Sequence, residues 1–448
     1  MIVLKFGGTS VGGAEAIRRS AEIVAERAER HPVVVLSAMT GVTDQLLEAA
    51  VLAAAGDREA VQARVQAVRA RHVDALWALV PENPAREEGC KRLNQLLSSL
   101  EAALDAVQEP GGPEWDAVAA HGELLSTTLF AAALPSVGLD PAWVDVREVM
   151  ITDDNWGRAL PDVDQLRRLS REVVSPLVAG GRIPVTQGFV GSTPEGITTT
   201  IGRGGSDFSA TLLGRALEVE EIQIWTDVHG LMSADPRVVP QARALEEVTY
   251  DEAAELAYFG AKVLHPAAIV PALEAGIDVR IRNSLEPGHP GTRISADPGG
   301  RPGQVKSIAS KRGVATLSVR SPRMLGAHGY LGELFGILDR HRVVVDVVAT
   351  SEVSVSLSLE SGSVAPEVMA EVSEMGGAQL EENRAIICVV GEALRETPGI
   401  AARLFRAIAP VNVEMISQGA SRINITLVVK DADAAGVVRR LHDEFFPE

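Results

Sequence analysis

The segment Ile2-Val3-Leu4-Lys5-Phe6-Gly7-Gly8-Thr9-Ser10 joins a short apolar run to a glycine-rich loop. An amphipathic helical pattern follows from Ala14 to Arg30, and a second apolar run, Val33-Val34-Val35-Leu36, comes next. Continuous apolar runs that alternate with helices are typical of parallel strands, which are buried on both faces. This part of the sequence therefore predicts an α/β fold with a glycine-rich loop after its first strand.

The same alternation continues through the first two thirds of the chain. Further strands are predicted at Trp143-Val144, Ile183-Pro184-Val185-Thr186, Ile222-Gln223-Ile224-Trp225 and Val279-Arg280-Ile281. Between residues 44 and about 110 the pattern is almost wholly helical, with breaks near Gly56 and at 81–84, which predicts a helical insertion that serves as scaffold and in dimer packing. We expect one domain over 1–290 and a Pro- and Gly-rich linker over 291–304.

Beyond the linker the sequence repeats itself with a spacing of 70 residues. Helices are predicted at 330–340 and 399–409, each followed by a strand, a turn, an alternating strand and a second helix. With a preceding strand, each copy has the βαββαβ plan of a ferredoxin-like module, and two such modules usually bind small ligands at their interface. The repeat matches Phe335, Leu338, Val343, Ser351, Val353, Val355, Leu357 and Leu359 to Phe405, Ile408, Val413, Ser421, Ile423, Ile425, Leu427 and Val429.

Composition narrows the class of protein. The 448 residues carry 42 Lys and Arg against 60 Asp and Glu, a net charge of −18, which disfavours binding to nucleic acid. Cys90 and Cys388 stand apart without neighbouring ligands, which argues against disulfides and zinc. No signal sequence is apparent and no stretch approaches the ~18 apolar residues of a membrane span, so we expect a cytoplasmic protein.

The glycine-rich loop has the chemistry to hold phosphate. A lysine at the end of a strand can place its charge over a transferring phosphoryl group, and the backbone N–H groups of Gly7, Gly8 and Thr9 can hold phosphate oxygens. Because Lys5 precedes the glycines, the loop is not the G-x-x-x-x-G-K-[ST] type. The protein-kinase motifs are also missing, so both of those enzyme classes are disfavoured.

Four further stretches carry reactive side chains. Residues 199–207, Thr-Thr-Ile-Gly-Arg-Gly-Gly-Ser-Asp, combine glycines with an arginine suited to a carboxylate and with an acid. Residues 225–230, followed by Asp235-Pro236-Arg237, place hydroxyl, acid and base at a strand end, where open α/β sheets bind nucleotides. Residues 259–266 supply Lys262 for a nucleotide phosphate, with His265 in a structural role, and Glu123 lies in a helical pattern where it can pair with an ammonium group.

Taken in order, the motifs KFGGTS, VVLSAMTGVTD, HGELLST, TQGF, TTTIGRGGSD, WTDVHGLMSADPR and KVLHP resemble the aspartate kinases of the amino-acid kinase family. The resemblance covers essentially the whole chain and is strongest to the monofunctional, lysine-sensitive members. It implies a three-layer α/β sandwich with a mainly parallel sheet, followed by two ACT domains. The first ACT domain would span 313–380, and the second would combine 305–312 with 384–448.

The resemblance also implies the chemistry and its residues. ATP would transfer its γ-phosphate to the β-carboxylate of L-aspartate, giving 4-phospho-L-aspartate and ADP, by positioning and charge stabilisation. Magnesium would be bound mainly through ATP, without dedicated protein ligands. Lys5 and Asp207 would be catalytic; Ser37, Thr43, Glu123, Phe189, Arg203 and Ser206 would hold aspartate, with Arg203 on the α-carboxylate and Glu123 on the ammonium; Lys5, Gly7, Gly8, Thr9, Ser10, Thr226, Asp227, Asp235, Arg237, Lys262 and Val263 would hold ATP.

The first ACT domain resembles the lysine-binding segments of the lysine-inhibited members. Asp346 and Glu352 supply negative charge suited to the side chain of L-lysine, and the implied effector site comprises Met324, Tyr330, Leu331, Asp346, Thr350, Ser351 and Glu352. Two positions depart from the relatives: Met232 replaces a frequent tyrosine beside the nucleotide, and Ala327 replaces a serine. A homodimer through the ACT domains is expected, and a tetramer is left open.

Alternatives remain at this point. Threonine or diaminopimelate could replace lysine as the effector of the same reaction. A non-catalytic amino-acid sensor could keep the fold, although it would not need Lys5, Arg203, Asp207, Thr226, Asp227 and Lys262 together. A bifunctional enzyme with a homoserine dehydrogenase domain is disfavoured, because the sequence stops at Glu448 just after the second module.

Overall fold

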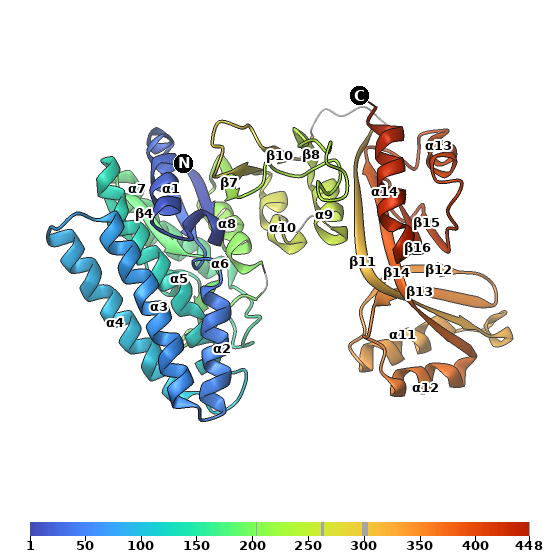
Figure 1. Ribbon diagram of the computed structural model, residues 1–448, viewed down its shortest axis with the longest axis horizontal. Coiled ribbons are helices and arrows are strands. Elements are labelled where there is room, and N and C mark those ends of the chain that lie inside the picture. Colours follow the sequence, from blue (N-terminus) through green and yellow to red (C-terminus); the bar gives the residue numbers. More distant parts are fainter. Residues whose placement is uncertain (203, 261–263, 298–302, 448) are drawn as a thin grey trace. The chain divides into compact units, whose positions relative to one another are not determined.

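The computed structural model describes residues 1–202, 204–260, 264–297 and 303–447. Its internal contacts define two compact units whose segments interleave along the chain (Figure 1). The first unit comprises Met1–Leu231, Glu246–Tyr250 and Val263–Pro298, and the second comprises Met232–Leu245, Asp251–Lys262 and Gly299–Glu448. The domain boundaries expected from sequence stay a prediction, and each unit is described by itself.

The first unit is built on a sheet with the strand order β3-β4-β2-β1-β7-β9-β10-β8. Among its described strands only β9 and β10 pair antiparallel. The mainly parallel sheet expected from the buried apolar runs is therefore confirmed. Its strands are β1 (Ile2–Phe6), β2 (Pro32–Leu36), β3 (Pro141–Trp143), β4 (Ile183–Gln187), β7 (Glu221–Thr226), β8 (Glu247–Thr249), β9 (Asp278–Asn283) and β10 (Thr292–Ser295); a separate hairpin joins β5 (Val190–Ser192) to β6 (Thr198–Thr200).

Strand β1 shows why the sheet has two different faces. All five of its residues are buried, and Ile2, Leu4 and Phe6 belong to one large apolar cluster with helices α1 to α5. Because successive side chains of a strand point to opposite faces, Val3 and Lys5 are directed to the other face. Helix α8, which packs on β1, receives the Lys5 side chain there.

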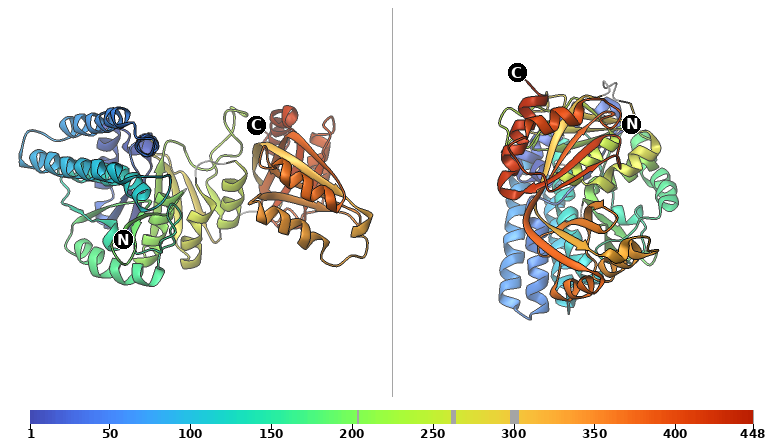
Figure 2. Two further views of the ribbon diagram at one scale, coloured as in Figure 1. Left: turned by 90° about the horizontal axis from the view of Figure 1, so that it is seen from below. Right: turned by 90° about the vertical axis from the view of Figure 1, so that its right-hand side faces the viewer.

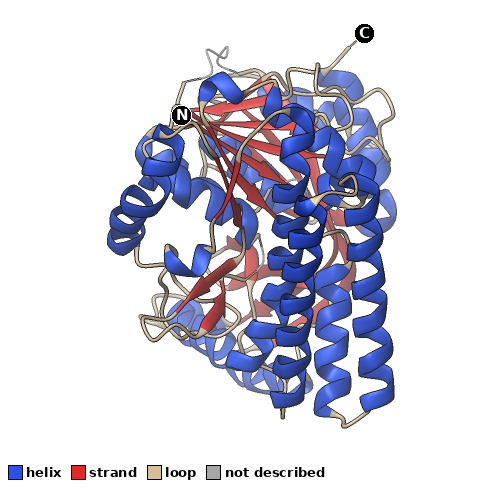
Figure 3. Ribbon diagram, turned by 90° about the vertical axis from the view of Figure 1, so that its left-hand side faces the viewer, coloured by secondary structure: helices blue, strands red, loops and turns tan. Residues whose placement is uncertain are grey.

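The helical insertion consists of α2, α3 and α4, which run as long rods beside the sheet (Figure 3). Its breaks fall at 55–57 and 80–83, where the sequence predicted them. The helices of this unit are α1 (Ala14–Ala25), α2 (Val42–Ala54), α3 (Arg58–Leu79), α4 (Pro84–Ala106), α5 (Pro113–Ala133), α6 (Val163–Leu169), α7 (Ser175–Ala179), α8 (Gly205–Ala216) and α10 (Pro266–Ala275), with short turns η1 (Gly8–Val11), η2 (Ala28–Arg30), η3 (Leu134–Val137), η4 (Val146–Glu148) and η5 (Ser170–Val174).

Helix α5 is the most apolar long helix that the structure describes. With the following turn it covers Pro113–Val137, and it is long and apolar enough to cross a membrane. However, 83% of the apolar window is buried inside the fold, as in the central helix of a globular core. Its apolarity is explained by packing, because it contacts β3, β4 and the helices α1 to α4.

The second unit is built on an antiparallel sheet with the order β12-β13-β11-β14-β16-β15. The long strands β11 and β14 serve both modules: residues 314–320 of β11 pair with β13, whereas 305–312 pair with 385–391 of β14 (Figure 2). Each module thereby has a ferredoxin-like strand order, which confirms the predicted fold class. The strands are β11 (Val305–Arg320), β12 (Val345–Thr350), β13 (Ser354–Glu360), β14 (Gly377–Gly391), β15 (Met415–Gln418) and β16 (Asn424–Lys430).

Two pairs of helices cover this sheet. Helices α11 and α12 lie at one end of the long strands, and α13 and α14 lie at the other (Figure 1). Each pair closes its own apolar core, one around Leu317, Leu334 and Leu357, the other around Ile387, Leu404 and Leu427. The helices are α9 (Tyr250–Phe259), α11 (Tyr330–Arg340), α12 (Pro366–Met375), α13 (Ile400–Ala407) and α14 (Asp431–Phe445), with the turn η6 (Pro322–Met324).

Two local expectations were wrong. The helix expected over 14–30 ends at Ala25, and 28–30 form a short 3-10 turn before a left-handed His31 (φ 54°). Residues 292–295 do not belong to a linker, because they form β10 between β8 and β9. Gly291 (φ 73°) reverses the chain there, and a Cβ at this glycine would lie 2.0 Å from the Ile281 carbonyl oxygen, so glycine is required.

Candidate active site

The predicted catalytic pair meets at the end of β1. Lys5 Nζ lies 2.5 Å from Asp207 Oδ1, and both side chains are almost buried, with exposed fractions of 9% and 13%. Asp207 stands in the first turn of α8, and the left-handed Gly204 (φ 75°) immediately precedes the helix. Strand and helix therefore present a cation and a carboxylate to each other from distant parts of the sequence.

The glycine-rich loop packs closely on the loop that follows β2. A Cβ at Gly8 would lie 3.0 Å from the Ala38 carbonyl oxygen and 3.3 Å from the Thr40 nitrogen, so Gly8 is needed for this approach. Ser10 is buried, and its hydroxyl lies 2.8 Å from Ser284 Oγ and 3.2 Å from the Trp225 oxygen. The Ser10 side chain thus fastens the loop to the ends of β7 and β9.

Helix α5 presents Glu123 beside the same two loops. Glu123 is 3% exposed, and its Oε2 has no hydrogen-bond partner among the described residues. Burial raises the pKa of Glu123 to about 8, an effect opposed by the Ala38 backbone and by the charge of Lys5. Such a buried acceptor with unused capacity is suited to an ammonium group.

Gly122 explains how the helix comes so close. A Cβ at this position would lie 2.7 Å from the Ala38 Cβ and 3.6 Å from Thr43 Oγ1. Ser126, one turn further along α5, donates its hydroxyl to the Ser37 carbonyl at 2.7 Å. The predicted substrate residues Ser37, Thr43 and Glu123 are therefore brought together around one helix.

Phe189 and Ser206, also predicted to bind the substrate, lie where the turn after β4 meets the start of α8. Phe189 has a left-handed backbone (φ 66°), which is unusual for an aromatic residue, and its N–H donates to Ser209 Oγ at 2.9 Å. A Cβ at Gly188 would lie 2.7 Å from Ser206 Cα, and one at Gly205 would lie 2.8 Å from the Phe189 ring. The turn after β4 and the start of α8 therefore interlock through two glycines.

The residues that were predicted to bind the nucleotide belong to both units. In the first, Thr226 ends β7 and donates its hydroxyl to Asp227 at 3.2 Å. In the second, Arg237 is bound to Asp235 by an ion pair of 2.7 Å. Arg203, Lys262 and Val263, which the sequence also predicted for substrate and nucleotide, lie outside the described residues.

His265 has the structural role that the sequence favoured. Its Nδ1 accepts the Ala267 N–H at 3.3 Å and so caps the start of α10. A Cβ at Gly204 would lie 2.5 Å from the His265 Cβ, so this histidine also packs against the start of α8. Both contacts support a structural role for His265.

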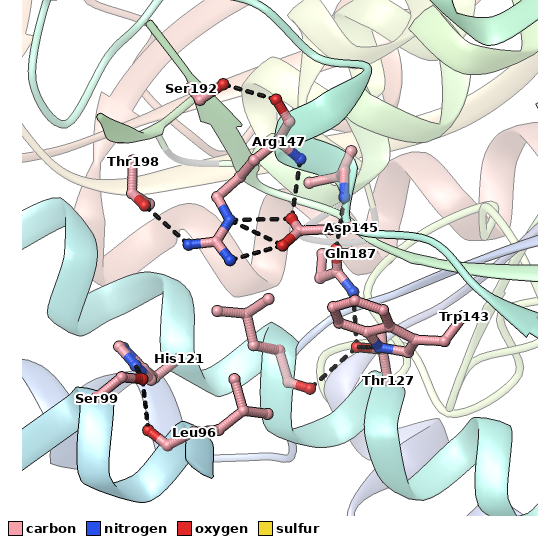
Figure 4. Close-up of polar contacts among 12 residues, drawn as sticks. Leu96, Ser99, His121, Thr127, Trp143, Asp145, Arg147, Gln187, Ser192 and Thr198 are labelled. Atoms are coloured by element: carbon pink, nitrogen blue, oxygen red, sulfur yellow. Dashed lines mark hydrogen bonds and ion pairs between the residues drawn. The ribbon is translucent and has the colours of Figure 1, made fainter. Parts of the chain in front are cut away.

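Sequence reasoning missed several polar residues that support the site. Gln187, at the end of β4, donates to Thr127 of α5 at 2.8 Å and accepts the Val146 N–H at 2.8 Å (Figure 4). Arg147 binds Asp145 in a bidentate pair and donates to Thr198 of the β5–β6 hairpin at 3.1 Å (Figure 4). No local pattern marks such residues, because their partners come from separate elements.

The helical insertion also contributes a missed residue. Arg71 of α3 donates to the Thr40 carbonyl at 2.7 Å and to the Gly12 carbonyl at 2.9 Å. It therefore links the glycine-rich loop to the loop that carries Ser37 and Thr43. The insertion was expected to act as scaffold, and this contact shows how it reaches the site.

The predicted effector residues lie in the second unit. The Asp346 side chain is only 1% exposed; Lys311 Nζ lies 2.7 and 2.8 Å from its two oxygens, and it accepts the Tyr258 hydroxyl at 2.5 Å. Tyr330 lines a separate cavity of about 730 Å³ between α11 and α12, and Leu331 is 41% exposed. Met324 ends η6, Thr350 ends β12, and Ser351 bonds Ser354 at 2.7 Å within the segment that contains Glu352.

Within the described residues, no group of three or more His, Cys, Asp or Glu side chains is arranged to hold a metal ion. The carboxylates nearest to the predicted chemistry are Asp207, held by Lys5, and Asp227, bonded to Thr226. This donor set fits an ion that is bound chiefly by other ligands.

Comparison with known proteins agrees with the geometry. The model of the amino acid kinase family matches residues 1–283, and a model of the ACT domain matches 387–445. The chain therefore belongs to the amino acid kinase family. Within that family it is an aspartokinase: it is 38% identical to lysine-sensitive aspartokinase 3 of Escherichia coli over 455 residues, covering 100% of this chain and 99% of the relative.

Solved structures support the same conclusion. The crystal structure of E. coli aspartokinase III with aspartate and ADP, described as the R-state, covers 100% of both chains at 38% identity with a TM-score of 0.85. The same enzyme with lysine and aspartate, described as the T-state, gives a TM-score of 0.83 at 37% identity. Aspartokinase 2 of Arabidopsis thaliana is 36% identical over 462 residues, covering 99% of this chain and 84% of the relative.

Proposed function

We propose that this aspartokinase transfers the γ-phosphoryl group of ATP to the β-carboxylate of L-aspartate, and that Lys5, Asp207 and Glu123 carry the reaction. The observation that supports these roles best is the Lys5–Asp207 pair, 2.5 Å apart, in the same site as a buried Glu123 whose Oε2 has no partner among the described residues. Phosphoryl transfer to an amino acid requires a cation for the phosphoryl group and an anion for the α-ammonium group, and Lys5 and Glu123 supply these side by side. The products are 4-phospho-L-aspartate and ADP, in the first step of lysine, threonine and methionine synthesis.

Aspartate is held by charge complementarity. Glu123 accepts the α-ammonium group, and its buried position strengthens this pairing because little water competes. Arg203 takes the α-carboxylate, and Ser37, Thr43, Phe189 and Ser206 surround the side chain. This orientation leaves the β-carboxylate facing ATP.

Lys5 stabilises the charge that moves during transfer. A β-carboxylate oxygen forms the new bond to the γ-phosphorus while the bond from that phosphorus to the β,γ-bridging oxygen breaks, and no general base is needed because the nucleophile is already ionised. The Lys5 ammonium lies at the strand end where the γ-phosphoryl group must pass, and Asp207 fixes its position. Catalysis thus consists of positioning and charge stabilisation.

ATP is held by the glycine-rich loop, with Thr9 and Ser10 at its end, and by Thr226, Asp227, Asp235, Arg237, Lys262 and Val263. Magnesium, when bound to the ATP phosphates, supplies charge neutralisation to the transfer. Asp207 and Asp227 are the carboxylates of the first unit that would face it. The exposed Arg237 is oriented by Asp235, which suits contact with an anionic group.

L-lysine is the effector that we propose for the first ACT module. The carboxylate of Asp346 pairs with the Lys311 ammonium, and this internal pair supports the choice of a ligand with an ammonium side chain. The relative that was solved with lysine and aspartate supports the same choice. Threonine or diaminopimelate is the alternative effector of the same reaction.

We further propose that the enzyme acts in the cytoplasm as a dimer through its ACT modules. The exposed apolar residues Phe335 on α11, and Val344 and Val348 beside and within β12, support this assembly. Light scattering on the purified protein measures it. A monomer at all concentrations would refute the dimer.

The reaction is tested by ATP-dependent formation of aspartyl hydroxamate. Activity is expected with L-aspartate and not with L-glutamate or N-acetyl-L-glutamate, in keeping with the relative that was solved with aspartate and ADP. Turnover of glutamate or acetylglutamate but not of aspartate would refute the assignment of L-aspartate as the substrate. Binding of aspartate or lysine without any turnover would instead favour the non-catalytic sensor.

The effector is tested by titrating the same activity with lysine, with threonine, with diaminopimelate, and with lysine and threonine together. Inhibition by lysine alone is expected. Indifference to lysine would overturn the effector assignment and leave the kinase assignment intact.

A further inference from the structure

Helix α5 carries a buried carboxylate that the proposed chemistry does not use. Asp116 stands in the first turn of α5 and is only 2% exposed. Its Oδ2 accepts the Thr200 N–H at 2.7 Å and the Gly157 N–H at 3.0 Å, and its Oδ1 accepts the Thr200 hydroxyl at 2.9 Å. Burial raises the pKa of Asp116, and these hydrogen bonds oppose that rise.

All of these contacts end on one loop system. Thr200 is the last residue of β6, and the glycine-rich stretch of residues 202–205 follows it directly. The Ala159 N–H donates to the Thr200 carbonyl at 2.9 Å, and a Cβ at Gly202 would lie 2.9 Å from the Gly157 carbonyl oxygen. Asp116 therefore holds two segments in place: the one around Gly157, and the end of β6 at Thr200, after which the chain continues to α8.

The other end of the same helix segment carries Glu123. Asp116 and Glu123 are seven residues apart, which corresponds to two turns and about 10 Å along the axis, so both lie on nearly the same side of α5. The helix is buried through this stretch, and a packed helix does not change its length. The distance between the Glu123 carboxylate and the end of β6 at Thr200 is thus set by one rigid element.

We propose that Asp116 is a positioning residue for the amino-acid substrate: through Thr200 and Gly157 it holds Ile201 and Gly202 at a fixed distance from Glu123. This inference rests on the proposed function, in which Glu123 binds the α-ammonium group, and Arg203 and Ser206, which follow Gly202 in the sequence, bind the rest of aspartate. Misplacement of Ile201 and Gly202 weakens aspartate binding and leaves the ATP side, built on β1 and β7, unaffected. The carboxylate does not touch substrate.

The geometry makes a specific prediction about two substitutions. In Asp116→Asn, the amide oxygen can accept both backbone N–H groups, and the amide nitrogen can donate to Thr200 Oγ1, which then acts as acceptor. All three contacts survive without the charge. In Asp116→Ala all three are lost, and the two buried N–H groups are left without that partner.

Steady-state kinetics with the full-length enzyme test the proposal. We expect Asp116→Ala to raise the aspartate KM about 10-fold or more and to keep the ATP KM within about 2-fold, whereas Asp116→Asn stays within about 3-fold of wild type for both, since this is the cost range of one to two buried hydrogen bonds. Thr200→Val, which removes one hydroxyl and folds more readily, should raise the aspartate KM by a smaller factor in the same direction.

Asp162→Ala is a matched control. Asp162 caps α6 by accepting the Asp164 and Gln165 N–H groups, so its loss lowers the Tm without altering the aspartate KM. An unchanged aspartate KM in Asp116→Ala would overturn the proposal. It would also be overturned if the aspartate KM and the ATP KM of this variant rose together as its Tm fell. Absence of aspartate-dependent turnover in wild type would instead refute the proposed function.

Discussion

Each unit holds a lysine–carboxylate pair beside its predicted ligand, and the two pairs differ in burial. In the first unit Lys5 and Asp207 are both nearly buried, with side-chain exposures of 9% and 13%. In the second, Asp346 is 1% exposed but its partner Lys311 is 31% exposed. A buried ammonium cannot leave without an uncompensated charge, whereas a half-exposed one can return to water. The first pair therefore suits a fixed catalytic group, and the second suits an exchangeable one.

The position of each lysine on its strand accounts for this difference. The parallel sheet of the first unit buries both strand faces, so a charged side chain such as Lys5 is kept only where a partner stands opposite. In the second unit Lys311 of β11 is partly exposed, whereas Lys306, earlier on the same strand, is buried against Glu252.

The largest expected effect comes from breaking the first pair. Lys5→Ala should lower kcat by about 10²–10³-fold or more, because it removes a preorganised charge from the transfer step. Asp207→Ala should also lower kcat, because the Lys5 side chain would lose the partner that fixes its position. Lys91→Ala, an exposed lysine on α4, is the control for the loss of one positive charge. Near-normal turnover by Lys5→Ala with an intact fold would contradict its catalytic role.

The second effect concerns Glu123 and is visible in the pH profile. A free-enzyme pKa of about 8 keeps this carboxyl largely protonated at pH 7, and the ionised form is needed to bind an ammonium group. The value of kcat/KM for aspartate should therefore rise with pH from about 6 to 8 and level off above. Glu123→Gln should lower kcat/KM about 10–100-fold and flatten this rise.

Stability gives an independent check on Glu123. A carboxyl whose pKa is raised on folding from 4.5 to about 8 stabilises the protein fully below 4.5, and this contribution is lost as the pH rises through 8. Thermal unfolding of wild type and Glu123→Gln across this range measures it. The same slope in both proteins would mean that Glu123 is not the titrating group.

The third effect sharpens the contrast between the pairs. Lys311→Ala removes the internal ammonium from Asp346, so the concentration of L-lysine needed for half inhibition should fall several-fold, up to about 10-fold. Asp346→Asn should raise it. Arg312→Ala, which breaks the neighbouring pair with Asp431, is the control. An identical lysine response in Lys311→Ala and wild type would show that the two ammonium groups do not compete.

The smallest effect is expected from the helical insertion. Arg71→Ala should lower kcat/KM by about 3–10-fold, because it releases the link between the Gly12 and Thr40 carbonyls. Arg69→Ala is a matched control on the same helix, since the partners of Arg69 among the described residues are Asn94 and Glu101 of α4. Equal losses in both variants would mean that the insertion acts through its overall stability.

Strand and helix patterns were sufficient to predict most elements. The apolar runs at 2–4, 33–36, 183–186 and 222–225 all became strands, and the helix at 330–340 has the predicted bounds. Strand β10 was missed because its four residues follow a Pro- and Gly-rich turn, and so short a strand is stabilised by its neighbours β9 and β8 rather than by its own pattern. The end of α1 was misplaced because helix ends depend on local capping.

The sequence by itself determined the chemistry available at the site: a lysine at a strand end, glycines where loops approach closely, and acids at helix starts. Those choices are local, because each depends on backbone conformation or on the residue type that a reaction needs. Only the tertiary structure decided which of them meet. The contact of Lys5 with Asp207, the buried position of Glu123 and the links made by Asp116 and Arg71 join elements far apart in the chain. Their distances follow from sheet order and helix packing, which no single segment encodes.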